Sequence, residues 1–527
     1  MLREQARRKP TAIAIRQKDF GIWKPLSWAD YWQRACRVGL GLRALGLGAG
    51  GRVAIVSENR VEWLLTQLGA GTVGGVAVGV YSTSPAEEMG YVLEHADVEL
   101  VVCEDQEQTD KVLQVAHRLP LLRRIVMMET KGLRSYPPAD RTRIVTFAEV
   151  EADGARREAV EFPALNAALD TQRLDDTGLM IYTSGSTGKP KGVVHTHGNL
   201  WHTAELYAKP VLGIREDDVV FSAAKLFFAY GLGNGLTFPL SVGATVILMG
   251  ERPTPQAVFQ RLTRHRPTVF YGVPTLYASM LASPDLPPRD QVALRVCTSA
   301  GEALPRDIGE RFTRHFGCEI LDGIGSTEML HIFISNQTGQ LRYGTTGKPV
   351  PGYEVQLRDD NGAPVAPGAI GDLYIKGPSA ALMYWNNRDK TRQCFLGDWL
   401  KSGDKYTCDA DGYYTYAGRS DDMIKVSGQY VSPVEVENIL VQHEAVLEAA
   451  VIGVPDHDGL VKTKAYVVLR PGFEPDAQTG AALQHYVKQH LAPFKYPRQI
   501  DFTEELPKTA TGKIQRFRLR QLEEATL

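Results

Sequence analysis

The chain has 527 residues, more than one compact hydrophobic core usually holds, so we expect two or more domains. Its 43% hydrophobic and 23% charged residues are ordinary for a globular protein, and its formal net charge of −2 argues against a nucleic-acid-binding protein, which normally carries a basic excess. The six cysteines are scattered, without a C-x-x-C pair or clustering with histidine, so neither a disulfide framework nor a zinc site is predicted.

The sequence shows no sign of a targeting segment or a membrane span. Residues 1–10 are charged and no apolar stretch follows them, which argues against a signal peptide. No apolar run reaches the roughly 18 residues that a membrane-spanning helix needs. Free thiols are typical of a reducing compartment, so we expect a cytoplasmic protein.

Helical and strand-like patterns alternate over residues 1–150, which predicts a parallel α/β layer. Residues 151–176 are polar and poor in pattern, and we expect them to be a connection. The predicted helices of this part are 28–45, 62–68, 85–95 and 106–118, and the predicted strands are 52–56, 76–80 and 100–103.

The alternation continues from residue 178 to about 418, with a turn-rich stretch at 353–375 that looks antiparallel, as a small barrel or a distorted sheet. The predicted strands are 219–223, 244–248, 268–271, 294–298 and 319–321.

Residues 423–527 form a separate α+β pattern with a polar tail. Its predicted helices are 433–443 and 480–491, and its predicted strands are 448–454 and 464–469. We therefore predict an α/β chain with a large domain at 1–420 and a small domain at 421–527. The large domain divides into an N-terminal layer (1–150), a central part (177–350) and a β-rich part (351–420).

Residues 182–192 read Tyr-Thr-Ser-Gly-Ser-Thr-Gly-Lys-Pro-Lys-Gly, a composition that indicates a phosphate-binding loop. Glycines let the backbone fold closely around an anion, and successive N–H groups form a concavity that binds it. The P-loop of other nucleotide-binding proteins has four residues between its glycines and Ser or Thr after its lysine, so it does not match. A Gly-Ser-Thr-Gly sequence alone would favour a solvated turn. The predicted phosphate contacts are Thr183, Ser184, Gly185, Ser186, Thr187, Gly188, Lys189 and Lys191.

The flanks of this loop suggest how it is held. Residues 177–181 are mostly apolar and suit the end of a strand, whereas 193–206 have polar and apolar residues at helix-compatible spacing.

Four further stretches carry candidate chemistry, although each alone would read as a turn, a linker or a solvated tail. Asp322-Gly-Ile-Gly-Ser-Thr-Glu328 ends in a carboxylate, and a carboxylate beside a triphosphate suggests an intervening Mg²⁺. The others are Lys401-Ser-Gly-Asp404, the stretch 418–428 and Leu506-Pro-Lys-Thr-Ala-Thr-Gly-Lys-Ile514. For Asp422, within 418–428, we favour a plain charged linker.

These stretches, in this order, resemble the motifs of the adenylate-forming superfamily, which includes acyl-CoA synthetases, peptide-synthetase adenylation domains and firefly luciferase. The resemblance implies ATP, Mg²⁺ and a small domain that is mobile about Asp421. It also implies a role for each matching residue. By this resemblance, Thr327 contacts the α-phosphate and Glu328 binds the metal. Gly301 and Glu302 contact the adenine, and Asp404 and Arg419 contact the ribose. Lys425, Ser427 and Gly428 line the pantetheine channel, and Lys513 is the lysine that takes part in adenylation.

We expect two stretches, Lys225–Asn234 and Met329–Phe333, to select the carboxylic acid that such an enzyme would adenylate. Phe227, Phe228 and Tyr230 provide a rigid aromatic wall beside small residues, which suits a flat apolar ring. For Phe227 we favour ordinary core packing, and a buried core histidine is the common alternative for His331. The residues assigned to the acid are Phe228, Ala229, Tyr230, Gly325, His331 and Ile332.

From about residue 176 onward the chain resembles the benzoate-CoA ligases of bacterial aromatic degradation. The resemblance rests on 225–234, 323–333, 377–387 and 428–437. The first 150 residues look more like long-chain fatty acyl-CoA synthetases, in stretches such as Ser57-Glu-Asn-Arg60.

We therefore expect an AMP-forming ligase that converts a small aromatic acid, most simply benzoate, to its CoA thioester through an acyl-AMP. A homodimer is expected only at the level of the family. The alternatives are a ligase for another aromatic, alicyclic or fatty acid, an enzyme that loads a carrier protein, and a non-catalytic nucleotide-binding protein.

Overall fold

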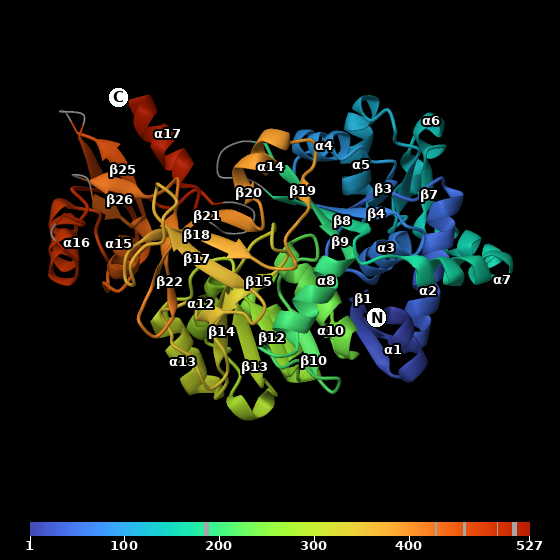
Figure 1. Ribbon diagram of the computed structural model, residues 1–527, viewed down its shortest axis with the longest axis horizontal. Coiled ribbons are helices and arrows are strands. Elements are labelled where there is room, and N and C mark those ends of the chain that lie inside the picture. Colours follow the sequence, from blue (N-terminus) through green and yellow to red (C-terminus); the bar gives the residue numbers. More distant parts are fainter. Residues whose placement is uncertain (184–188, 427–428, 457–459, 493, 509–513, 527) are drawn as a thin grey trace. The chain divides into compact units, whose positions relative to one another are not determined.

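The computed structural model describes residues 1–183, 189–426, 429–456, 460–492, 494–508 and 514–526, and their elements are shown in Figure 1. They group into two compact units. The first consists of residues 1–183, 189–354 and 376–400, and the second of Val355–Ile375 and the described part of Lys401–Leu527. Helices and strands are mixed throughout both units, which confirms the predicted α/β class.

An eight-stranded sheet in the first unit has the order β19-β9-β8-β4-β3-β5-β6-β7. Three of its strands, β3 (Arg52–Val56), β4 (Val76–Val80) and β5 (Leu100–Cys103), match the predicted ranges and are parallel. The others are β6 (Arg124–Met127), β7 (Ile144–Thr146), β8 (Thr177–Thr183), β9 (Lys191–Thr196) and β19 (Met383–Tyr384).

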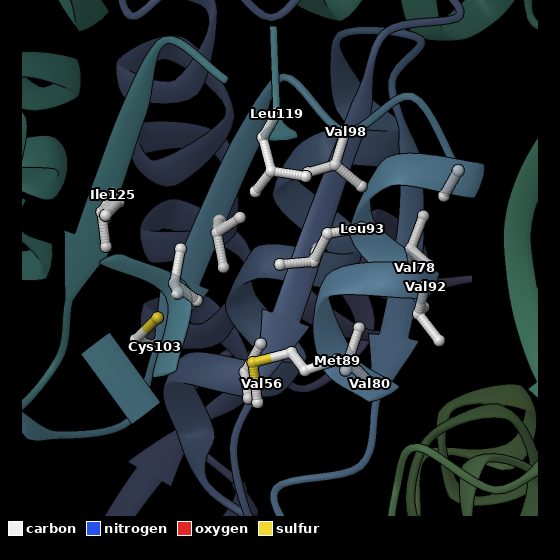
Figure 2. Close-up of a cluster of buried hydrophobic side chains, with 14 of the residues drawn as sticks. Val56, Val78, Val80, Met89, Val92, Leu93, Val98, Cys103, Leu119 and Ile125 are labelled. Atoms are coloured by element: carbon white, nitrogen blue, oxygen red, sulfur yellow. The ribbon is translucent and has the colours of Figure 1, made fainter. Parts of the chain in front are cut away.

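The core of this layer follows from the composition of its strands. β-Branched side chains suit a pleated surface, and strands of a parallel sheet that is covered on both faces are apolar throughout. Figure 2 shows Val56, Val78 and Val80 together with Met89 and Leu93 of a covering helix. The helices of this layer are α2 (Trp28–Ala44), α3 (Val61–Thr72), α4 (Ala86–His95), α5 (Gln106–Val115) and α6 (Pro138–Arg141).

The expected connection at 151–176 is wrong, because helix α7 (Phe147–Thr171) occupies most of it. The helix begins with a capping box, in which Thr146 and Glu149 each satisfy a backbone N–H of the other. Arg34 and Arg37 of α2 form ion pairs of 2.7 and 2.8 Å with Glu151 and Glu158 of α7. Helix α7 is stabilised by packing against α2, and its own sequence has too few apolar residues at helical spacing to predict it.

A second, nine-stranded sheet of the first unit has the order β16-β15-β14-β13-β12-β10-β11-β1-β2. Its central strands are parallel and lie close to the predicted ranges. The strands are β1 (Ile13–Asp19), β2 (Ile22–Ser27), β10 (Val219–Ser222), β11 (Thr245–Ile247), β12 (Val269–Gly272), β13 (Val296–Ser299), β14 (Ile320–Gly325), β15 (Ile332–Ser335) and β16 (Lys348–Pro349). The accompanying helices are α1 (Leu2–Arg8), α9 (Ala229–Leu232), α10 (Phe238–Val242), α11 (Pro255–His265), α12 (Pro274–Ala282) and α13 (Arg306–Phe316). Helices α8 (His197–Thr203) and α14 (Arg388–Cys394) contact strands of the eight-stranded sheet instead, α8 at β8 and β9 and α14 at β19.

The helix suggested for 193–206 begins later than its spacing indicates. Residues up to Thr196 belong to β9, which runs antiparallel to β8, and α8 starts only at His197. Val193 and Val194 are β-branched and buried, so they pack better in a strand than in a helix.

The second unit holds the C-terminal part and, of the β-rich part, the segments 355–375 and 401–420. Its strands include β17 (Glu354–Arg358), β18 (Gly371–Lys376), β21 (Trp399–Cys408) and β22 (Tyr414–Arg419), of which β21 and β22 are antiparallel. Strand β20 (Phe395–Leu396) pairs with the start of β21. The C-terminal part contains β23 (Ile424–Val426), β24 (Gln429–Val431), β25 (Val446–Pro455), β26 (Val461–Leu469), β27 (Gln499–Phe502), α15 (Pro433–Leu440), α16 (Ala477–His490) and α17 (Arg516–Thr526).

The expected polar tail is therefore incomplete as a description, because helix α17 forms within it. Leu519 of this helix is buried beside Ala450 and Ile452 of β25, which explains why a mostly polar segment folds. No helix in the described part of the chain is both long and apolar enough to cross a membrane.

Candidate active site

The predicted phosphate loop joins two antiparallel strands of one hairpin. Thr183, the last residue of β8, lies opposite Lys191, the first residue of β9. The ammonium of Lys189 lies 5.0 Å from the ring centre of Tyr91, and that of Lys191 lies 4.8 Å from the ring centre of Tyr384. The predicted contacts Ser184, Gly185, Ser186, Thr187 and Gly188 lie outside the described residues.

The turn that carries Thr327 and Glu328 follows β14 and lies beside this hairpin. The hydroxyl of Tyr384 donates a 2.6 Å hydrogen bond to Oε1 of Glu328. Burial and the neighbouring Glu328 raise the pKa of Tyr384 well above its ordinary value, so the phenol keeps its proton. Lys191, Tyr384 and Glu328 thus form one connected group. Tyr384 lies in a stretch quoted for its resemblance, but sequence reasoning gave it no role.

A buried histidine also connects the hairpin to this turn. Nε2 of His195 lies 2.7 Å from the carbonyl oxygen of Thr327, and Nδ1 lies 2.8 Å from Nδ2 of Asn199. Burial lowers the pKa of His195 to about 4, so the ring is neutral at physiological pH. Sequence reasoning missed both residues, because a histidine within a strand gives no local signal of its partner 132 positions away.

The predicted adenine contacts lie just after β13, at the edge of the sheet where the parallel strands end. Gly301 has φ +96° and no atom within 4 Å of a Cβ added there, and Glu302 is half-buried. Asp322, near the middle of the adjacent β14, is buried, and Oδ1 of its carboxyl makes no hydrogen bond with the described residues. Burial raises its pKa to about 8. Asp322 pairs with Ser299, the last residue of β13, so its carboxyl lies level with the end of that parallel strand. A buried carboxyl with one unsatisfied oxygen at this position is a candidate ligand contact that sequence reasoning left unassigned.

Two of the residues predicted to contact the acid substrate, Tyr230 and His331, lie side by side. The ring centres of Tyr230 and His331 are 5.5 Å apart, and the hydroxyl of Tyr230 lies 2.6 Å from Oγ1 of Thr298. A Cβ added to Gly233 would lie 2.3 Å from Cδ2 of His331, so only glycine leaves room for this imidazole. Burial lowers the pKa of His331 to about 3, so the ring is neutral. Ala229 and Ile332 are buried, and Gly325 is half-buried.

Residues of the N-terminal layer contact Lys225–Asn234, the stretch assigned to the acid substrate, and its flank directly. The side chain of Asn59 donates to the carbonyl of Ala224 at 3.0 Å and accepts from the N–H of Leu226 at 2.7 Å. Phe228 packs on Tyr81 from the same layer, with ring centres 4.8 Å apart. The N-terminal layer therefore positions the aromatic wall.

The predicted ribose contacts lie in the second unit, where they are paired with each other. Nη1 of Arg419 donates to Oδ1 of Asp404 at 3.0 Å, and the pKa of Arg419 is raised chiefly by this carboxylate. The side chain of Asp421 is exposed. Lys425 belongs to β23, whereas Ser427, Gly428 and Lys513 lie outside the described residues.

The interpretation of Asp422 as a plain charged linker is wrong. Its carboxylate is largely buried and lies 2.9 Å from Arg520 and 3.5 Å from Arg516. Arg516 also donates two hydrogen bonds, of 3.0 and 2.6 Å, to the buried Glu437 of α15. The segment after Asp421 is therefore fastened to α17 and, through Arg516, to α15.

No cluster of three or more metal-binding side chains occurs in the part of the chain that the structure describes. A site built on Glu328 would therefore supply one carboxylate. This fits Mg²⁺, which in nucleotide-binding enzymes is held by one or two carboxylates together with substrate phosphates and water.

Comparison with known families matches two parts of the chain. Residues 2–385 match the family described as AMP-binding enzyme, and residues 435–513 match the AMP-binding enzyme C-terminal domain. The first match contains the phosphate loop and the turn at Thr327, the second ends at Lys513, and the stretches 401–404 and 418–428 lie between the two.

Individual relatives give a similar picture. A benzoate–CoA ligase from Thauera aromatica is 52% identical over 92% of this chain and 89% of its own. A 4-hydroxybenzoate–CoA/benzoate–CoA ligase from Rhodopseudomonas palustris is 43% identical over 95% of this chain and 89% of its own. The crystal structure of a benzoate CoA ligase from Burkholderia xenovorans LB400 matches with 52% identity and a TM-score of 0.86, covering 98% of both chains. Given the family match over most of its length, this chain belongs to the AMP-binding enzyme family, whose members include these acid–CoA ligases.

Proposed function

We propose that this protein is a benzoate–CoA ligase, which converts benzoate, ATP and CoA to benzoyl-CoA, AMP and pyrophosphate. The observation that supports it most is the 52% identity to the Thauera aromatica benzoate–CoA ligase over 92% of the chain. The rings of Tyr230 and His331, which pack on each other, give the proposed acid pocket a rigid aromatic wall, and this agrees with a flat aromatic substrate.

In the first step, an oxygen of the benzoate carboxylate attacks the α-phosphorus of ATP. The bond from this phosphorus to the bridging oxygen breaks, and pyrophosphate leaves with that electron pair. The phosphate loop, with Thr183, Thr187 and Lys191 among its contacts, binds the leaving phosphates. Lys513 offsets the negative charge that develops on the α-phosphate, and Thr327 holds one of its oxygens.

Glu328 would hold the Mg²⁺ of this step. When bound, Mg²⁺ neutralises charge on the phosphates. Tyr384 donates to one carboxylate oxygen of Glu328 and so orients the other. Lys191 contacts the ring of Tyr384, which supports a shared role of Lys191 and Glu328 at the triphosphate.

The remaining contacts hold the nucleotide and the acid. Gly301 and Glu302 flank the adenine, and Asp404 accepts from the ribose hydroxyls with Arg419 beside it. Phe228, Ala229, Tyr230, Gly325, His331 and Ile332 surround the benzoate ring. Nε2 of His331 donates to Oδ1 of Asn234 at 3.2 Å and the ring is neutral, so His331 closes the pocket and forms no ion pair with the carboxylate.

In the second step, the CoA thiol attacks the carbonyl carbon of benzoyl-AMP, and AMP leaves as the thioester forms. Residues 421–527 turn about Asp421 between the steps, which removes Lys513 and brings Lys425, Ser427 and Gly428 to the pantetheine. The buried ion pairs of Asp422 support a hinge at Asp421, since they fasten the chain immediately after it. ATP and CoA are abundant in the cytoplasm, where we place the enzyme.

The test is CoA-thioester formation with ATP and Mg²⁺ across benzoate, 4-hydroxybenzoate, 2-aminobenzoate, cyclohexanecarboxylate, octanoate and palmitate. We expect benzoate to give the highest kcat/KM. A preference for palmitate would contradict the aromatic assignment and would favour a fatty acid ligase. Benzoyl-AMP formation without transfer to CoA would favour an enzyme that loads a carrier protein.

A further inference from the structure

The buried imidazole of His195 makes two hydrogen bonds whose directions can be assigned. The carbonyl oxygen of Thr327 can only accept, so Nε2 of His195 carries a proton and donates at 2.7 Å. Nδ1 of the neutral ring is then an acceptor, and Nδ2 of Asn199 donates to it at 2.8 Å. The side chain is completely buried, so no water competes for either bond.

The amide of Asn199 is fixed independently of the histidine. Its Nδ2 also donates to the carbonyl of Ala380 at 3.1 Å, and its Oδ1 accepts from the hydroxyl of Thr196 at 3.0 Å. A rotated amide would place an acceptor against the carbonyl of Ala380. Asn199 therefore imposes on His195 the tautomer that donates to Thr327.

This arrangement joins three segments that meet at the proposed phosphate site. His195 lies on β9, four positions after Lys191 at the end of the phosphate loop. Its acceptor belongs to Thr327, and the next residue is Glu328. The segment of Ala380 is fastened to the same turn, because the N–H of Ala381 donates to the carbonyl of Glu328 at 2.8 Å.

We infer that His195 is a positioning residue for adenylation, which holds the backbone of Thr327 and Glu328 in register with the strand that leaves the phosphate loop. The inference rests on the proposed function, since it takes Thr327 and Glu328 as the contacts to the α-phosphate and the metal. His195 touches neither substrate nor metal and acts through the backbone of the turn.

The alternative is a histidine that only fills space in the core, and the hydrogen bonds of the turn separate the two. The carbonyl of Thr327 also accepts from the N–H of Leu330 at 3.1 Å, so losing His195 does not leave this oxygen without a partner. Leucine fills a similar volume without a donor. We therefore expect His195→Leu to fold with a Tm close to that of the parent but with a displaced turn.

The experiment compares His195→Leu with His195→Gln, whose amide can place an N–H near the position of Nε2. His315 of α13 provides a control, because its imidazole also donates to a backbone carbonyl, that of Pro287 at 2.9 Å, and contacts neither β9 nor the turn at Thr327 through this bond. The readouts are benzoate-dependent ATP–pyrophosphate exchange, the separate KM values for ATP and benzoate, and the dissociation constant of AMP without Mg²⁺.

We expect His195→Leu to lower kcat/KM for ATP about tenfold and to weaken AMP binding by a similar factor, with the KM for benzoate unchanged. His195→Gln should restore most of both, and His315→Leu should match the parent. Parental exchange and AMP binding in His195→Leu would overturn the inference, as would equal losses in the Leu and Gln variants that follow a lowered Tm. If the parent shows no exchange with any acid, the proposed function fails, and AMP binding still decides the role of His195.

Discussion

The hydroxyl of Tyr384 donates a 2.6 Å hydrogen bond to the carboxylate of Glu328, although the two residues are 56 positions apart. Tyr384 belongs to β19, which pairs with β9, and β9 begins at Lys191. The pairing of these short strands therefore brings a phenol, a carboxylate and a lysine of the phosphate loop together. This relationship gives Tyr384 a specific task, which is to orient the proposed metal ligand.

Replacing Tyr384 by phenylalanine tests this task, because the change removes the hydroxyl and keeps the ring under Lys191. A hydrogen bond to a charged group contributes about 1.5–3 kcal/mol, so we expect kcat/KM for ATP in pyrophosphate exchange to fall about tenfold or more. The matched control is Tyr136→Phe, since Tyr136 donates to the carboxylate of Asp110 at 2.7 Å in the N-terminal layer. An equal effect of both changes, or no effect of Tyr384→Phe, would contradict the assignment.

Lys513 should serve one half-reaction only. In Lys513→Ala we expect pyrophosphate exchange to fall by about 10²–10³, the usual effect of losing one group that stabilises charge in the transition state. Thioester formation from preformed benzoyl-AMP should be nearly unchanged, since no charge then develops on the α-phosphate by nucleophilic attack. Lys508→Ala is the control from the same stretch, because its ammonium pairs with Glu448 at 2.6 Å. A similar loss in both half-reactions would rule out the role.

The acid assignment can be tested through Gly233 without touching a residue that contacts the substrate. The methyl group of Gly233→Ala would lie 2.3 Å from Cδ2 of His331, so the imidazole must leave its present position beside Tyr230. We expect the KM for benzoate to rise about tenfold or more while the KM for ATP stays constant. In the control Gly235→Ala, the added methyl group meets only the flexible end of Leu226, at 3.0 Å. An unchanged KM for benzoate would place the acid elsewhere.

Strands with a purely local cause could be predicted from the sequence. The ranges 52–56, 76–80 and 100–103 are short runs of mainly β-branched residues that are buried on both faces, and the structure has strands at these positions. Helix α7 could not be predicted, because its helical state depends on packing against α2 more than 100 positions earlier.

In the candidate site, too, residues with a local sequence signal could be predicted and residues that depend on distant partners could not. The motifs marked the phosphate loop and the turn at Thr327, because glycines, hydroxyls and charges at close spacing are a local signal. Tyr384 and His195 are recognisable only by their partners, which the pairing of β8, β9 and β19 provides. The structural role of Asp422 could not be predicted from its local sequence either, because its partners Arg516 and Arg520 lie almost 100 positions further along the chain.

The buried carboxyl of Asp322 should make stability depend on pH. Its pKa is about 8 in the folded protein, against about 3.9 for an unfolded chain. Between these values the folded protein binds a proton that the unfolded chain has released. The contribution is complete below the unfolded pKa and is lost as pH rises toward 8, at about 1.4 kcal/mol per pH unit.

Asp322→Asn removes this dependence, because the amide cannot ionise. We expect the Tm of the variant minus the Tm of the parent to increase steadily as the pH is raised from 5 to 8. All seven tryptophans lie in the first unit, so their fluorescence reports its unfolding. Asp153→Asn is the control, since Arg157 lowers the pKa of Asp153 and its titration falls outside this window. A difference between variant and parent that stays constant from pH 5 to pH 8 would show that Asp322 is already ionised in the folded protein and would contradict the raised pKa.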